Sequence, residues 1–188
     1  MTTALQWVVL GCAAYLALVY LAYLVLIVVG VVENGARRRE STAQDYDALL
    51  ASRFTIPVSV VVAAYDEESA IVSTVRSLLA LDYPEFEVIV VNDGSRDGTL
   101  QRLVQAFDLE PVELFRRRIV ETKPVRAHYR SREHPRLLVA DKENGGKADA
   151  LNAGLNLSRY RYVCGVDADT VFAPDALLKG MRLVLTDP

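Results

Sequence analysis

The sequence predicts one α/β domain, with a mostly parallel sheet and flanking helices, preceded by one N-terminal transmembrane helix. Three observations support this fold class. All 45 charged residues, 21 basic and 24 acidic, lie at or after Glu33, so the chain begins with a long uncharged stretch. Beyond it, short runs of β-branched residues alternate with stretches of helical periodicity, which is typical of a parallel sheet wrapped by helices. The connections that follow these runs gather carboxylates, glycines and a lysine.

The composition excludes several function classes. With 52% hydrophobic and 24% charged residues, the chain is neither disordered nor collagen-like. A net charge of −3 gives no general attraction to nucleic acid. Two cysteines, Cys12 and Cys164, are too few for a disulfide framework.

Residues 7–32 form 26 consecutive uncharged positions and are predicted to span a membrane. As a helix this run would measure about 39 Å, which exceeds the roughly 30 Å of a bilayer core. A cleaved signal peptide is the alternative, but it would have a basic start and a shorter apolar core. Arg37, Arg38 and Arg39 follow the run and no basic residue precedes it. This charge bias predicts an external N-terminus and a cytoplasmic domain at the cell (inner) membrane.

The remainder divides into a polar juxtamembrane linker, residues 33–55, which we expect to be helical around 43–50, and a domain over residues 56–188. Four buried strands are expected from β-branched runs at 58–63, 87–91, 136–140 and 162–166. Four helices are expected from apolar spacing at 67–81, 97–107 and 147–157, and from Pro174 onward.

A basic segment, residues 116–136, separates the second and third strand–helix units. It holds eight basic residues against Glu121 and Glu133. We favour a solvated insertion. The alternative is a basic flap that contacts anionic lipid head groups or an anionic ligand beside the membrane.

Candidate site residues follow each predicted strand, where open parallel sheets bind their ligands. Asp167 and Asp169 are spaced to hold one divalent cation through carboxylate oxygens. Lys147 is the first residue of a predicted helix and follows two glycines. The free amides of the helix start and the lysine ammonium group could bind a phosphate. Turn and cap roles are the alternative for the other polar residues of these connections. Those residues are Asp66, Glu67 and Asp93; Gly94 belongs to the same turn as Asp93, and Tyr65 directly precedes Asp66.

Four segments in order resemble the nucleotide-binding half of family-2 glycosyltransferases of GT-A (Rossmann-like) fold: PVSVVVAAYDEE, FEVIVVNDGSRDGT, ENGGKADALNAG and YVCGVDADT. The resemblance covers residues 56–188 and implies a UDP-sugar donor with Mg²⁺ or Mn²⁺. By matching motifs, Asp93 would bind the uridine, with Gly94 in the same donor site, and Lys147 would contact the diphosphate. Asp167 and Asp169 would form the metal and diphosphate site. Tyr65, Asp66 and Glu67 match the segment beside the base.

The sequence departs from the family pattern at two positions. Asp66 stands where Asn is usual, and Asn92 stands where many members have an Asp. The arrangement of a membrane helix ahead of the domain is similar to that of polysaccharide synthases of the hyaluronan, chitin and poly-N-acetylglucosamine type. The resemblance implies transfer to a glycan or lipid-linked acceptor with inversion, beside membrane lipids and without nucleic acid. It places the acceptor half and its general base beyond residue 188, so we expect an N-terminal fragment whose sheet has an exposed edge.

Three other interpretations stay open. A dolichyl-phosphate-sugar-synthase-like transferase has related motifs. A nucleotidyltransferase would favour a glycine-rich loop after the first strand, and residues 63–69 contain no glycine. A non-catalytic, membrane-tethered nucleotide-sugar-binding protein would need the same donor site.

Overall fold

The computed structural model describes residues 2–42, 56–114 and 119–186. The chain divides into two compact units, residues 1–49 and residues 50–188.

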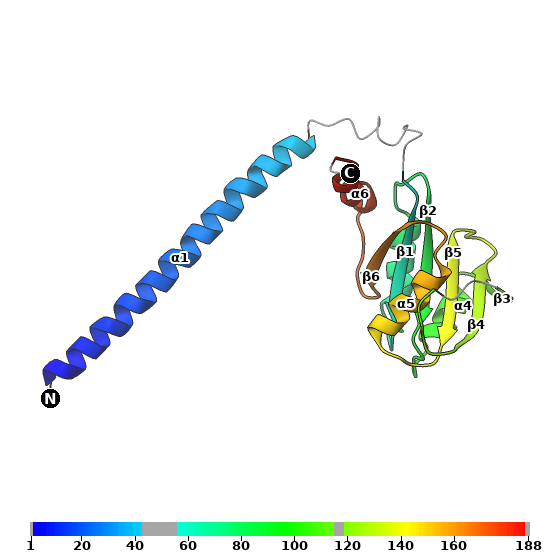
Figure 1. Cartoon of the computed structure of the whole chain (residues 1–188), viewed down its shortest axis with the longest axis horizontal. Coiled ribbons are helices and arrows are strands. Elements are labelled where there is room, and N and C mark those ends of the chain that lie inside the picture. The colour runs from blue at the N-terminus through cyan, green and yellow to red at the C-terminus, as the bar shows by residue number, and fades with distance from the viewer. Residues whose placement is uncertain (1, 43–55, 115–118, 187–188) are drawn as a thin grey trace. The chain divides into compact units, whose positions relative to one another are not determined.

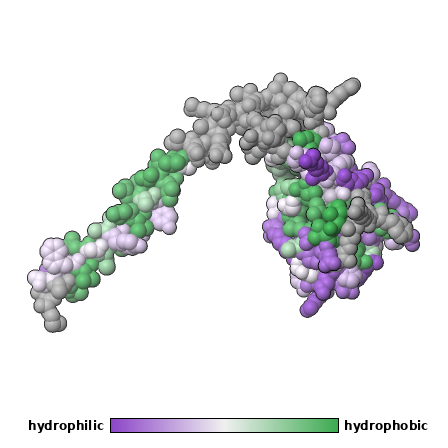
Figure 2. All heavy atoms as spheres, in the orientation of Figure 1, coloured by the Kyte–Doolittle hydropathy of each residue, from purple (hydrophilic) through white to green (hydrophobic). Residues whose placement is uncertain are grey.

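The described part of the first unit is helix α1 (Thr2–Thr42), with a candidate membrane span at Leu5–Val31. The span has a mean hydropathy of 2.6. All but one of its described large apolar side chains are 52–75% exposed, the exception being the half-buried Val19, and Figure 2 shows mostly hydrophobic residues along α1. Such a surface suits a lipid environment better than water. The helix also runs ten residues past the expected end of the span at 32, because Ala, Arg and Glu in that stretch are good helix formers. The helix expected around 43–50 lies outside the described residues.

The second unit is built on a six-stranded sheet with the order β3-β4-β5-β2-β1-β6 (Figure 1). Its strands are β1 (Val58–Ala64), β2 (Phe86–Asn92), β3 (Leu109–Val112), β4 (Val125–Ser131), β5 (Leu137–Lys142) and β6 (Tyr162–Asp167). β1, β2, β5 and β6 pair in parallel, whereas β4 runs antiparallel to β3 and β5. The mostly parallel sheet expected from the sequence is confirmed, and so are its four predicted strands.

Helices cover both faces of this sheet. They are α3 (Ile71–Leu79), α4 (Thr99–Ala106), α5 (Lys147–Leu157) and α6 (Ala176–Thr186). On one face, Val61 of β1 packs in a core cluster with Ala150 and Ala153 of α5. On the other face, Val60 lies with Leu78 and Leu177 of α3 and α6. Each fully buried Val or Leu contributes about 1.5–3 kcal/mol, so the β-branched runs hold the two layers together.

The basic segment 116–136 is not a solvated insertion, because it contains strand β4 and leads into β5. Three of its arginines have structural partners: Arg132 pairs with Glu110, Arg126 lies 3.8 Å from Asp141, and the guanidinium of Arg136 lies 4.7 Å from the Phe86 ring centroid. β4 has arginine or histidine at every second position and only its last residue is fully buried, so its pattern is too polar for a buried strand. A basic flap stays a prediction for the rest of the segment.

A buried carboxylate fastens the amino ends of the central strands. Glu87 of β2 has a side chain only 4% exposed. It accepts hydrogen bonds from the Ser59 hydroxyl at 2.7 Å and from the backbone N–H and Nε of Arg159 at 2.6 and 2.8 Å. The connection from α5 to β6 is thereby held against β1 and β2.

Replacing this carboxylate with an amide should destabilise the domain. We expect Glu87→Gln to lower the free energy of unfolding by about 2 kcal/mol, because a charged hydrogen-bond acceptor is lost inside the fold. Urea unfolding of the detergent-solubilised chain, followed by circular dichroism, measures the change. Glu110→Gln is the control, since its partner Arg132 is at the surface, and it should unfold like the parent. Equal losses in the two variants would contradict the assigned role of Glu87.

Candidate functional site

A cavity of about 410 Å³ lies at the carboxyl edge of the parallel strands, within the 300–1,000 Å³ (roughly) that ligand pockets occupy. Connections after β1, β2, β5 and β6 all contribute to its wall. Six of the eight predicted site residues line it: Tyr65, Glu67, Asp93, Lys147, Asp167 and Asp169. The two others, Asp66 and Gly94, lie in the same connections but do not line the cavity.

Asp66 shapes the wall of the cavity through its backbone. Its φ of 56° lies in the left-handed region, where Asn and Asp are the best tolerated residues after glycine. This explains how Asp can stand where the family usually has Asn. The Asp66 carboxylate accepts the Arg96 N–H at 2.7 Å, and the Asp66 N–H donates to the Ser95 hydroxyl at 3.0 Å.

The connections after β1 and β2 are tied to each other by further hydrogen bonds. The Glu67 N–H donates to the Thr99 hydroxyl at 2.9 Å, and the Glu68 N–H donates to Asp97 at 3.0 Å. The Glu68 carboxylate in turn accepts the Gly98 N–H at 3.0 Å. Burial acts to raise the pKa of Asp97, but hydrogen bonds from Thr99 and Glu68 outweigh it, so this pKa is below its ordinary value. Asp97 therefore stays ionised and keeps the two connections together.

Asp93 lies at the floor of the cavity, with its side chain only 3% exposed. Its carboxylate accepts the Gly145 N–H at 3.0 Å and the Gly146 N–H at 2.7 Å. It also accepts a hydrogen bond from Nζ of Lys142 at 2.6 Å. These two glycine amides, which the sequence suggested for a phosphate, therefore bind Asp93 in this structure.

Gly94 and Gly146 are glycines for conformational reasons. Gly94 has a φ of 68°, and a Cβ there would come within 2.8 Å of the Asn144 backbone nitrogen. Gly146 has a φ of 89° and is the N-cap residue directly before α5. As the N-cap residue, Gly146 has no side chain that could cap this helix. The first-turn amides of α5 can therefore receive an anion from the cavity.

Lys147, Asp167 and Asp169 form the open side of the cavity. Lys147 makes an ion pair with Asp167, and their side chains are 62% and 57% exposed. Asp169 is also exposed. Among the described residues, no group of three or more His, Cys, Asp or Glu side chains could hold a metal ion. Two carboxylates nevertheless fit Mg²⁺ or Mn²⁺, because such hard ions commonly take one or two carboxylates and complete their shell with phosphate oxygens and water.

Two residues beside the cavity, Lys142 and Asn92, were not among the predicted site residues. Lys142 ends β5 and is completely buried between Asp93 and Asp149. The Asn92 side-chain amide donates to Asp141 at 2.7 Å, so Asn suits the position where many family members have an Asp. The only feature of the sequence that could have indicated Lys142 and Asn92 is that each ends a buried strand.

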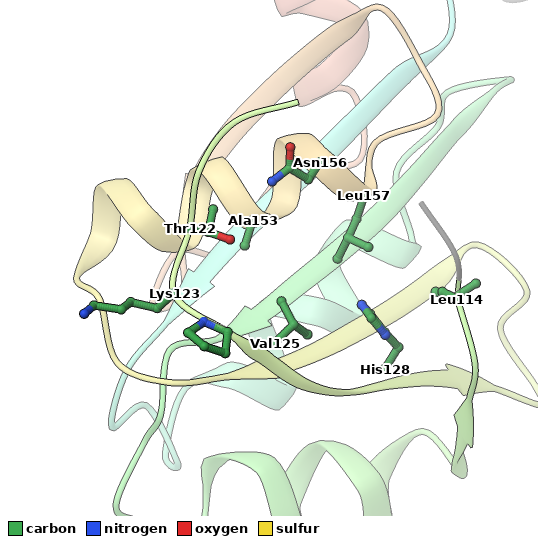
Figure 3. A pocket seen from close by; sticks show the side chains of 9 residues that line it. Leu114, Thr122, Lys123, Val125, His128, Ala153, Asn156 and Leu157 are labelled. Atoms are coloured by element: carbon green, nitrogen blue, oxygen red, sulfur yellow. The ribbon is translucent and has the colours of Figure 1, made fainter. Parts of the chain in front are cut away.

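A second cavity, of about 300 Å³, lies between α5 and β4 and is shown in Figure 3. Val125 and His128 approach it from the β4 side, and Ala153 and Leu157 from α5. His128 is half-buried here, and burial lowers its pKa. The lining is largely apolar and holds neither of the predicted metal carboxylates.

The sheet, the cavity at its carboxyl edge and the carboxylates around it define an α/β domain of the class that binds ligands where parallel strands end. A family model described as glycosyl transferase family 2 matches residues 59–188, more than half of the chain. The chain therefore belongs to glycosyl transferase family 2. The resemblance inferred from the four motifs is confirmed.

Among curated proteins, the chain is similar to poly-β-1,6-N-acetyl-D-glucosamine synthases. It is 34% identical over 119 residues to that of Staphylococcus epidermidis, covering 63% of this chain and 23% of the relative. It is 32% identical over 120 residues to that of Staphylococcus aureus, with the same coverage. The chain thus spans about a quarter of the length of the curated relatives that it matches.

Solved structures share the fold. TarS of S. aureus, in complex with UDP-GlcNAc, is 27% identical, with a TM-score of 0.51 over 70% of this chain and 32% of that chain. The mannosyltransferase PcManGT of Pyrobaculum calidifontis, in complex with GDP-Man and Mn²⁺, is 26% identical, with a TM-score of 0.56 over 72% and 34%. The GT-A fold class expected from the sequence is confirmed.

Proposed function

We propose that this chain is the donor-binding part of a membrane-anchored glycosyltransferase. It would transfer a sugar from a UDP-sugar to a glycan or lipid-linked acceptor, with a divalent cation and inversion at the anomeric carbon. The observation that carries the proposal is the single cavity that brings Tyr65, Glu67, Asp93, Lys147, Asp167 and Asp169 together. These residues come from four connections that are far apart in the sequence.

Different parts of the cavity wall would bind different parts of the donor. Tyr65 and Glu67, after β1, and Asp93, after β2, would hold the base and ribose. Lys147 and the open start of α5 would bind the diphosphate, because ammonium and free amide groups both attract phosphate. The names of the relatives and the UDP-GlcNAc bound to TarS support N-acetylglucosamine as the sugar.

Asp167 and Asp169 would hold the divalent cation. When bound, this ion neutralises charge on the departing diphosphate. Lys147 pairs with Asp167 in this structure. On donor binding, its ammonium group would exchange this carboxylate for phosphate oxygens. Mn²⁺ in the complex of the related mannosyltransferase supports Mn²⁺, and Mg²⁺ has the same preference for oxygen ligands.

The helix α1 would anchor the enzyme in the cell membrane. Its candidate span is followed by three arginines, which supports an N-terminus outside and a donor site in the cytoplasm. The acceptor would then be a glycan or a lipid-linked sugar at the same membrane, next to lipid head groups.

Calorimetric titration of the detergent-solubilised chain tests the donor site. We expect UDP to bind with Mn²⁺ present, to bind much more weakly without it, and to be preferred over GDP and ATP. Circular dichroism on the same sample checks that the domain is folded. A folded chain that ignores UDP, or that binds all three nucleotides equally, would contradict the proposed donor.

A further inference from the structure

Lys142 is a buried cation directly beneath the proposed donor site. Its side chain is 0% exposed, and it is the last residue of β5. Its Nζ lies 2.6 Å from Asp93 Oδ1, 2.5 Å from the Glu143 carbonyl oxygen and 2.5 Å from Asp149 Oδ2. An ammonium group has three N–H donors, and these acceptors use all of them.

The two carboxylates held by Lys142 belong to different parts of the cavity wall. Asp93, after β2, accepts the Gly145 and Gly146 amides and so fixes the loop that enters α5. Asp149 lies in the first turn of α5 and also accepts the Lys123 N–H at 3.1 Å. One ammonium group therefore joins the end of β2, the glycine loop and the start of α5.

The charges at this point oppose anion binding unless they are compensated. Asp149 carries a negative charge at the amino end of α5, the same place that a diphosphate would occupy, and Asp93 adds a second charge nearby. The hydrogen bond from Lys142 is the main cause that lowers the pKa of Asp149, so this carboxylate remains charged. Lys142 offsets one of the two negative charges and holds one oxygen atom of each carboxylate.

We propose that Lys142 is a positioning residue for the donor diphosphate, which it serves without touching it. By holding Asp93 and Asp149, it sets the glycine loop and directs the first-turn amides of α5 and Lys147 toward the phosphates. The inference rests on the proposed donor site. It goes beyond that site because Lys142 lies outside the residues that line the cavity.

The test compares UDP with uridine, which lacks the diphosphate. In the full chain with Mn²⁺, Lys142→Met keeps the length and apolar stem of the side chain and removes its charge. We expect UDP affinity to fall at least about tenfold, the effect of losing one charged hydrogen bond, while uridine affinity falls much less. Lys142→Gln, which can still donate hydrogen bonds, should lie between the parent and Lys142→Met, and it serves if the methionine variant does not fold.

The matched control is Glu87→Gln, a buried carboxylate at the opposite ends of the strands. It should lower stability but leave the ratio of UDP to uridine affinity at the parent value. Unchanged UDP affinity in a folded Lys142 variant would overturn the inference. Equal losses for UDP and uridine would also overturn it, because they would make Lys142 merely structural. A parent chain that binds neither ligand would instead overturn the proposed donor site.

Discussion

Asp169→Asn should abolish metal-dependent UDP binding while the domain stays folded. Asp169 follows β6 on the open side of the cavity, and Asn has the same shape without the charge. Loss of an outer-shell partner already weakens metal affinity about 10–100-fold, so we expect more than about 100-fold for a direct ligand. Calorimetry with UDP at a fixed Mn²⁺ concentration, and Mn²⁺ titration followed by electron paramagnetic resonance, measure the two affinities.

The control for this variant is Asp175→Asn. Asp175 is a partly exposed carboxylate that pairs with Lys179 at 2.5 Å and does not line the cavity. Its substitution should leave both affinities unchanged. Both variants should unfold within about 0.5 kcal/mol of the parent, as is usual for surface positions. If Asp169→Asn bound UDP with the same Mn²⁺ dependence as the parent, the assigned metal site would be wrong.

Gly154→Ala should destabilise the domain although alanine favours helices. Gly154 lies in α5 against β1, and a Cβ at this position would come within 2.2 Å of Val61 Cγ1. Either α5 or β1 must shift, and such overpacking costs about 1–3 kcal/mol of unfolding free energy. The same displacement would move Lys147 at the start of α5, so UDP affinity should fall as well. Urea unfolding and UDP calorimetry measure the two effects.

Gly180→Ala provides a matched control in helix α6. Among the described atoms, nothing lies within 4 Å of a Cβ built at Gly180. This variant should therefore gain about 0.5–1 kcal/mol, the ordinary benefit of alanine over glycine inside a helix. Stabilisation by both substitutions would show that α5 does not pack against β1 as described.

The central strands could be predicted because strands that are buried on both faces have a recognisable sequence pattern. β1 and β2 are covered on both faces, so most of their positions are apolar, and four of the seven residues in each strand are Val or Ile. β4 has no such pattern, because Arg126, His128 and Arg130 occupy alternate positions. β3 is short and contains Pro111, which is tolerated at a sheet edge but does not favour a strand in isolation.

The outer residues of the site could also be anticipated. Lys147, Asp167 and Asp169 follow strands whose ends meet at one edge, and they line one cavity as expected. The hydrogen-bond partners of Asp93 could not be anticipated, because an Asp that binds a ligand and an Asp that binds a loop look alike in a sequence. Its partner Lys142 is 49 residues away, so the pairing arises only when β2 and β5 come together. The roles of these residues in donor binding remain predictions.

The hydrogen bonds between the connections after β1 and β2 have a consequence for the entropy of binding. Asp66, Glu68 and Asp97 hold these connections to one another before any ligand arrives. This part of the wall is therefore preorganised, and a base that enters it need not immobilise a loop. Lys147, by contrast, has a long exposed side chain, which would lose rotamer freedom on binding a phosphate. The entropic cost of closing the site thus falls mainly on its diphosphate end.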